Sequence, residues 1–183
     1  MVAYTNGENN TAPVVLTDNT TQLDVETTDT ATQSGQISET GGSWGLAKIG
    51  TGTLILSNAN TYSGGTNINA GTVQLDNIAG AGTGLITLNN TSALRLNTSG
   101  TLTDNLTVNG NDTISATAGN TVTLSPAAFN LATAFPTPAQ VHFGTSVDTG
   151  TILFGSTGLT GLNTDSSIYV DGACGRPTSR SPS

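Results

Sequence analysis

The sequence is short of positive charge, cysteine and long apolar runs. Its 183 residues include four Lys or Arg against 12 Asp or Glu, which gives a formal net charge of −8. Nucleic acids and anionic membrane surfaces are therefore not expected as partners, because both are bound through clustered Lys and Arg. The single cysteine, Cys174, excludes a disulfide within the chain. No run approaches the roughly 18 apolar residues of a membrane-spanning helix, so direct membrane insertion is not expected.

Residues that commonly carry catalysis or bind metals are also sparse. His142 is the only histidine, and together with Cys174 it forms no pattern of a metal site or of an activated nucleophile. Asp24 and Glu26 are two residues apart and would share a strand face, which acid–base catalysis or calcium binding could use. A solvated outer face is the simpler interpretation of this pair. We therefore expect no enzyme activity, no cofactor and no metal site.

The chain is rich in threonine, asparagine and glycine, with 23 glycines, and only 4% of its residues are aromatic. Such a composition is poor in helix formers and favours short strands joined by tight turns. Low charge and few aromatics also suit a disordered chain. Regular apolar alternation, as at Leu54 and Leu56 or at Val73 and Leu75, argues against disorder. The sequence therefore predicts an all-β fold.

A phrase of the form Gly-Thr-apolar-x-apolar recurs at 52–56, 71–75 and 150–154. Recurring strands that begin after a glycine are typical of a solenoid, whose coils turn tightly and then present an apolar face inward. A β-sandwich has similar strand spacing, so it stays as the alternative. Strands are expected at 14–16, 22–26, 53–57, 66–70, 72–76, 85–88, 93–96, 106–108, 113–116, 121–124, 141–143, 151–154 and 167–170.

Changes in composition and in strand pattern along the sequence divide the chain into five parts. Residues 1–40 are polar and threonine-rich and are expected to form the first coils, and 41–124 form the main β-helix. Three prolines in 125–138 predict a loop or short helix there, because proline cannot donate to a strand ladder. Further β coils are expected in 139–172, followed by an irregular tail in 173–183.

One segment has a specific motif with its spacing intact. Residues 42–57 read Gly-Ser-Trp-Gly-Leu-Ala-Lys-Ile-Gly-Thr-Gly-Thr-Leu-Ile-Leu-Ser, followed by Asn-Thr-Tyr-Ser-Gly-Gly-Thr at 60–66 and Gly-Thr-Val-Gln-Leu at 71–75. This segment, at about 42–76, resembles the autotransporter-associated β-strand repeat, also called the passenger-associated transport repeat. The matching positions are Trp44, Leu46, Lys48, Gly50, Gly52, Leu54, Leu56, Asn60, Thr61, Tyr62, Ser63, Gly64, Thr66, Gly71, Thr72, Val73 and Leu75.

The resemblance implies a right-handed parallel β-helix exported through the periplasm to the surface of a Gram-negative cell. The repeat would assist folding and secretion of a structural or adhesive passenger and would carry no catalytic residues. The implied partners are an outer-membrane β-barrel translocator, which is absent from this chain, and ligands on host or neighbouring cells. The alternatives are a polysaccharide-acting β-helix enzyme and a carbohydrate-binding β module. No residue of the sequence identifies which ligand would be bound.

The motif also has a physical interpretation based on period-two alternation. Leu54, Leu56, Ile68, Val73 and Leu75 are expected to point inward and to be buried. Thr53, Thr66 and Gln74 are expected to be mostly exposed. Glycines of the motif are expected at bends that need positive φ. Four asparagines suit turns and could stack into amide ladders between coils, namely Asn58, Asn60, Asn67 and Asn69.

Overall fold

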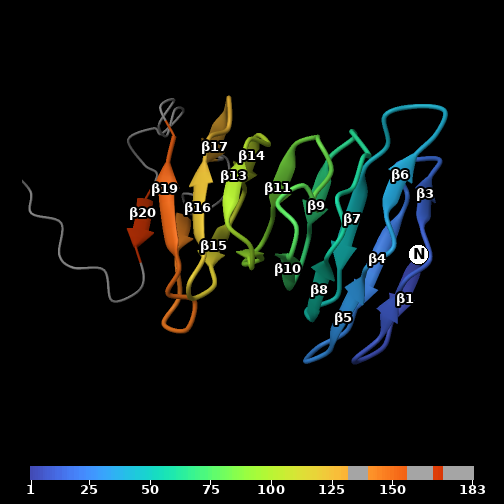
Figure 1. The fold of residues 1–183 in the computed structure, drawn as a ribbon, viewed down its shortest axis with the longest axis horizontal. Helices are drawn as coiled ribbons and strands as arrows, with labels where there is room; N and C mark the ends of the chain where they lie inside the picture. The colour runs from blue at the N-terminus through green and yellow to red at the C-terminus, as the bar shows by residue number, and fades with distance from the viewer. Residues whose placement is uncertain (132–139, 156–166, 171–183) are drawn as a thin grey trace, which may run out of the picture.

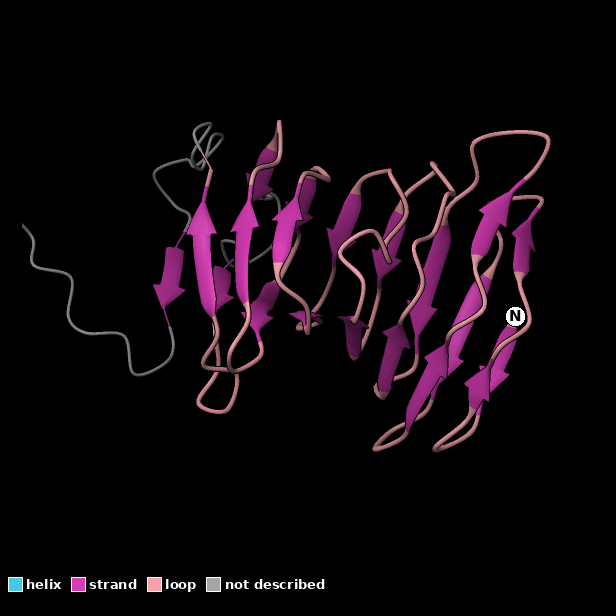
Figure 2. Cartoon of the chain, viewed as in Figure 1, coloured by secondary structure: helices cyan, strands magenta, loops and turns pink. Residues whose placement is uncertain are grey.

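The computed structural model shows short strands that stack coil upon coil along one axis (Figure 1). It describes residues 1–131, 140–155 and 167–170. All regular structure in these ranges is strand, with no helix (Figure 2). Accordingly, the described part of the chain includes no helix with the length and hydropathy needed to span a membrane.

Each coil contributes strands to separate sheets, which form the sides of the solenoid. The first sheet contains β1 (Val2–Tyr4), β4 (Gln22–Val25), β7 (Leu46–Ile49), β9 (Thr66–Ile68), β11 (Ile86–Leu88), β14 (Leu106–Val108) and β17 (Phe129–Leu131). The second contains β2 (Asn9–Asn10), β5 (Thr30–Gln33), β8 (Thr53–Leu56), β10 (Thr72–Leu75), β12 (Ala93–Leu96), β15 (Asn111–Ala116), β18 (Gln140–Phe143) and β20 (Ser167–Val170).

The third side is interrupted. It has a two-stranded sheet of β3 (Val14–Leu16) and β6 (Ile37–Glu39) at one end. It has a three-stranded sheet of β13 (Gly100–Leu102), β16 (Thr121–Leu124) and β19 (Thr151–Phe154) at the other. Between them, residues 57–65 and 76–85 complete their coils without a strand.

All strand pairs are parallel and join one coil to the next, which confirms the predicted solenoid and excludes the β-sandwich. One coil takes 20 residues between the paired Lys48 and Ile68, and 25 residues between Leu23 and Lys48. Because strands pair in register, equivalent positions stack into columns. One inward column of the first sheet consists of Leu23, Lys48, Ile68, Leu88, Val108 and Leu131.

The alternation expected for the apolar residues is confirmed, since Leu54, Leu56, Ile68, Val73 and Leu75 are fully buried. Their expected polar neighbours behave differently. Thr53 is half-buried, while Thr66 and Gln74 are buried, so the prediction for those two was wrong.

The two errors have different causes. Thr66 shares its strand face with Ile68, because they are two residues apart, so it points into the core. Gln74 does point outward, but neighbouring side chains cover it. Arg95 Nη1 donates to its Oε1 at 2.9 Å, and its own Nε2 donates to Asp76 at 2.7 Å.

The proline-containing segment also differs from the prediction of a loop or short helix. Phe129–Leu131 forms β17, a full member of the first sheet that pairs with β14. Phe129 and Leu131 are buried and alternate with exposed Asn130, so the inward period continues into this segment. The prolines at 136 and 138 fall in 132–139, outside the described residues, as do the tail 173–183 and Cys174.

This packing makes a first prediction about stability. Ile68→Ala removes a fully buried side chain between Lys48 and Leu88 and should lower the free energy of unfolding by about 2–5 kcal/mol. Asn67→Ala, at the exposed position beside it, should change that free energy by no more than about 0.5 kcal/mol. Denaturant unfolding followed by circular dichroism measures both values. Equal losses in the two variants would contradict the inward register described above.

Candidate functional site

The candidate functional site is the coil built from the motif residues, here called the repeat coil (residues 46–65), together with the next coil, which begins at Thr66. Its third side has no strand, and Asn60 replaces the missing ladder. The Asn60 backbone amide donates to Ala79 O at 3.0 Å, and its Nδ2 donates to Gly80 O at 2.6 Å, both in the next coil. Its Oδ1 accepts a hydrogen bond from Ile37 N at 2.7 Å, in the preceding coil. One buried amide therefore ties three successive coils together.

Tyr62 fills the interior of this third side. Its ring is fully buried, and its hydroxyl lies 2.5 Å from Thr66 Oγ1, which in turn donates to Ala81 O at 2.8 Å. Burial raises the pKa of Tyr62, so the hydroxyl stays protonated. Tyr62 is thus a core residue with a satisfied hydroxyl group and not a ligand anchor on the surface.

Lys48 points inward from β7 and is fully buried. Its Nζ donates to Ile49 O and Gly50 O, each at 2.7 Å, and to Ala70 O at 3.4 Å. Burial lowers the pKa of Lys48 from 10.5 to about 8, and the negative charges of Asp24 and Glu26 oppose this shift. The lysine therefore holds backbone carbonyls at the bend after β7 and joins the repeat coil to the next one.

Glu39, just before the motif, holds the loop that precedes β7. Its carboxylate accepts hydrogen bonds from Trp44 N at 2.7 Å, Ser63 N at 3.0 Å and Ser63 Oγ at 2.7 Å. Hydrogen bonds from Ser63 and from the Trp44 amide lower the pKa of Glu39. The Trp44 indole donates to Thr40 O at 2.8 Å, and its ring covers Gly42, so Trp44 secures the loop as well.

Close backbone approach explains the glycine at 52. A Cβ atom on Gly52 would lie 2.1 Å from Glu26 O in the preceding coil, so no side chain fits. Gly52 does not have the positive φ that the sequence interpretation gave to the motif glycines, whereas Gly50 (71°) and Gly71 (68°) do. The expected conformation is thus correct at Gly50, Gly65 and Gly71 but wrong at Gly52 and Gly64, where a Cβ atom would collide with the backbone of the preceding coil.

The remaining motif residues fall into three groups. Leu46, Leu54, Leu56, Val73 and Leu75 are buried in the core. Thr72 lies half-buried on the outer face of β10, next to Thr53 of β8. Thr61, Ser63 and Gly64 are exposed.

Several side-chain contacts between coils were not identified from the sequence. Asn69 does stack into an amide ladder, in which Asn89 Nδ2 donates to Asn69 Oδ1 at 3.0 Å and Asn109 Nδ2 donates to Asn89 Oδ1 at 2.9 Å. Its partners could have been found by the shared position, since each asparagine follows a first-sheet strand directly. The other three expected members do not join a ladder. Asn58 and Asn60 donate to the backbone carbonyls of Ser34 and Gly80, and Asn67 is stacked between Ala47 and Thr87.

The buried polar core was also missed. Gln33 points inward, accepts from the Tyr4 hydroxyl at 2.8 Å and donates to Ala12 O and Gly35 O. Asp112 is fully buried and accepts from Ser92 N at 2.7 Å. Burial raises the pKa of Asp112. The sequence gives no period-based signal for such residues, because inward polar side chains break the apolar pattern.

The described residues show no constellation for metal binding, since no group of three or more His, Cys, Asp or Glu side chains lies together. Asp24 is half-buried at the outer face of β4, and Glu26 follows the strand in the turn. His142 sits on β18, and its Nε2 lies 2.8 Å from Asn111 Oδ1. The contacts of the motif residues connect one coil to the next.

Two comparisons with known proteins agree with this organisation. Residues 46–75 match the family model described as passenger-associated-transport-repeat, so the chain carries this repeat and the resemblance is confirmed. The chain is also 36% identical over 107 residues to "Adhesin BmaC autotransporter" of Brucella suis biovar 1 (strain 1330). That alignment covers 55% of this chain and 3% of the adhesin, so the chain spans a very small part of that relative. No solved structure gives a significant match.

The buried lysine leads to a pH-dependent prediction. With a folded-state pKa of about 8 against the ordinary 10.5, Lys48 loses its proton in the folded state first, so the unfolded chain binds more protons between these pH values. The free energy of unfolding should therefore rise across this window relative to that of a Lys48→Met variant, which has no such group. Denaturant unfolding of both proteins at pH 7.5 and 10, roughly the two ends of the window, measures the difference. A difference independent of pH would show that Lys48 keeps its ordinary pKa.

Proposed function

We propose that this chain is a non-catalytic structural segment of an autotransporter passenger that is exported to the cell surface. Within it, the repeat coil assists folding and secretion of the passenger. The matched repeat and the adhesin relative support a passenger-associated role. The extended stack of coils supports a structural one, because such a stack spans distance at the cell surface without needing an active site.

The contacts of the repeat coil on both sides carry this proposal. Asn60 bonds to the coil before it and to the coil after it, and Lys48 and Tyr62 add contacts toward the coil after it. In a solenoid each coil is stabilised mainly by its neighbours. A coil that is bonded on both sides therefore helps the next coil to fold once the previous one has folded. A passenger that crosses the outer membrane in an extended form would then fold progressively outside it.

This function implies an outer-membrane translocator as the partner in secretion, with the periplasm as the route. Folding outside the membrane would oppose backward sliding of the chain, because a folded coil no longer fits through a narrow channel. The surface role, whether presentation of a neighbouring segment or adhesion, depends on the passenger as a whole.

Two substitutions in the complete passenger test the export role. Leu54→Asp places a charge without a partner in a fully buried position and should destabilise the coil by several kcal/mol. Gly52→Val introduces a Cβ that would lie 2.1 Å from Glu26 O, so the two coils must separate. Both variants should reach the surface in smaller amounts and should be degraded more in the periplasm. Surface labelling at matched total expression measures this effect.

Thr53→Ser is the matched control, because Thr53 lies between these two positions on the outer face and is half-buried. It should be displayed as the natural protein is. Normal display of both Leu54→Asp and Gly52→Val would show that the repeat coil is only a spacer and has no part in secretion.

A further inference from the structure

The coil after the repeat coil ends in a break of the third side. Its residues 77–82 form turns on themselves, with Gly80 N donating to Asn77 O and Gly82 N to Ala79 O. Backbone hydrogen bonds also run between this region and the repeat coil, from Asn60 N to Ala79 O and, just after the segment, from Thr83 N to Tyr62 O. Among the described residues, no backbone hydrogen bond joins this segment to β13, which is the first strand of its sheet. One edge of β13 is therefore left without a partner strand.

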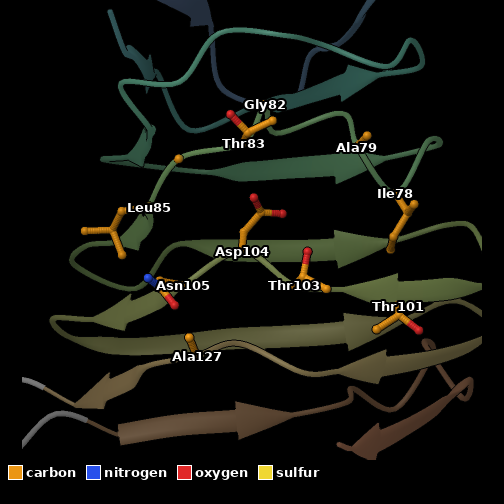
Figure 3. Close-up of a pocket in the computed structure, with 11 residues that line it drawn as sticks. Ile78, Ala79, Gly82, Thr83, Leu85, Thr101, Thr103, Asp104, Asn105 and Ala127 are labelled. Carbon is orange, nitrogen blue, oxygen red and sulfur yellow. The ribbon is translucent and has the colours of Figure 1, made fainter. Parts of the chain in front are cut away.

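An open pocket of about 540 Å³ lies at this break (Figure 3). Its polar lining comes from Thr83 on one side and from Thr101, Thr103, Asp104 and Asn105 on the other, in and after β13. The Asp104 carboxylate projects into the middle of the labelled residues. The volume falls within the roughly 300–1,000 Å³ that small-molecule sites occupy.

Most polar side-chain groups of the pocket form no hydrogen bond within the fold. The hydroxyl groups of Thr83, Thr101 and Thr103 form no hydrogen bond to any described residue. Asn105 Oδ1 accepts from Ala128 N at 2.9 Å, which fixes the amide and leaves its NH2 group able to donate into the solvent. Asp104 is half-buried, its carboxylate forms no hydrogen bond to another described residue, and burial raises its pKa.

We propose that this pocket binds one sugar unit of a glycan. A sugar hydroxyl both donates and accepts, so it can bond at once to an acceptor such as the Asp104 carboxylate and to a donor such as the Asn105 amide. Each threonine hydroxyl can donate or accept a hydrogen bond. The unpartnered edge of β13 adds backbone N–H donors and C=O acceptors. Ile78 and Ala127 give small apolar patches for the C–H face of a sugar ring.

A cation fits this lining less well. A metal ion needs several oxygen ligands, and no group of three acidic or histidine side chains is present among the described residues. An ammonium group would bond to Asp104 but would leave the donor group of Asn105 without a partner. The mixture of donors and acceptors therefore favours a polyhydroxylated ligand over a charged one.

The glycan site goes beyond the proposed function and does not depend on it. The export role rests on the repeat coil, whereas the pocket lies mainly in the two coils that follow. Binding can be measured on the purified chain without any secretion step. Failure of one proposal therefore leaves the other intact.

A nuclear magnetic resonance titration of the purified chain tests the site. The probes are methyl β-galactoside, methyl α-mannoside and N-acetylglucosamine, with methylammonium chloride as a cationic comparison. At least one sugar should shift the backbone amide signals of residues 83 and 101–105, with a dissociation constant on the order of 1 mM because the contacts are few. Methylammonium should leave those signals unchanged.

Asp104→Asn should weaken sugar binding about tenfold or more, because it removes the charged acceptor. Asp18→Asn makes the same chemical change at an exposed turn away from the pocket and should bind as the natural chain does. An unchanged signal pattern outside the pocket verifies that both variants are folded. The proposal is overturned if no sugar shifts these signals, if methylammonium alone shifts them, or if Asp104→Asn leaves sugar affinity unchanged.

Discussion

In-register parallel pairing is the constraint on which the rest of the structure depends. Because each strand lies directly on its counterpart one coil away, a side chain meets the same position of the next coil at every step. A column must therefore be uniform enough for its members to pack. The inward column through Ile68 is apolar except at Lys48, and that lysine turns its amine to the backbone carbonyls of a bend. The amide ladder from Asn69 to Asn109 follows the same rule at the surface.

The repeat coil differs from its neighbours mainly on its third side. There no strand forms, and side chains supplement the few backbone hydrogen bonds between coils, with Asn60 linking coils and Tyr62 filling the interior. Such contacts need particular residues at fixed positions, whereas a strand ladder needs only the backbone. This explains why the motif can be recognised in the sequence around these residues. The rest of the solenoid resembles related proteins only in its general pattern of short alternating strands and turn residues.

The parts of the fold that could be predicted from the sequence are those in which apolar and polar residues alternate along a strand. The solenoid, the buried apolar set and most strands from β8 to β16 were of this kind. The polar β5, with buried Gln33 at its end, was not found, because an inward glutamine looks like a surface residue. β17 was hidden by the prolines around it. The pocket could not be predicted, because it arises from a segment that turns on itself instead of pairing with β13, and this is a question of long-range contacts.

The distribution of charge has a consequence at the scale of many molecules. Within the described ranges both cationic side chains are engaged, Lys48 in the interior and Arg95 in an ion pair of 2.7 Å with Asp148. The outer face of the stack is therefore left with unpaired carboxylates. Crowded side by side, such rods repel one another over distances of about 8 Å at physiological ionic strength. Added salt shortens the range of this repulsion, so lateral association of the stacks should become easier as ionic strength rises.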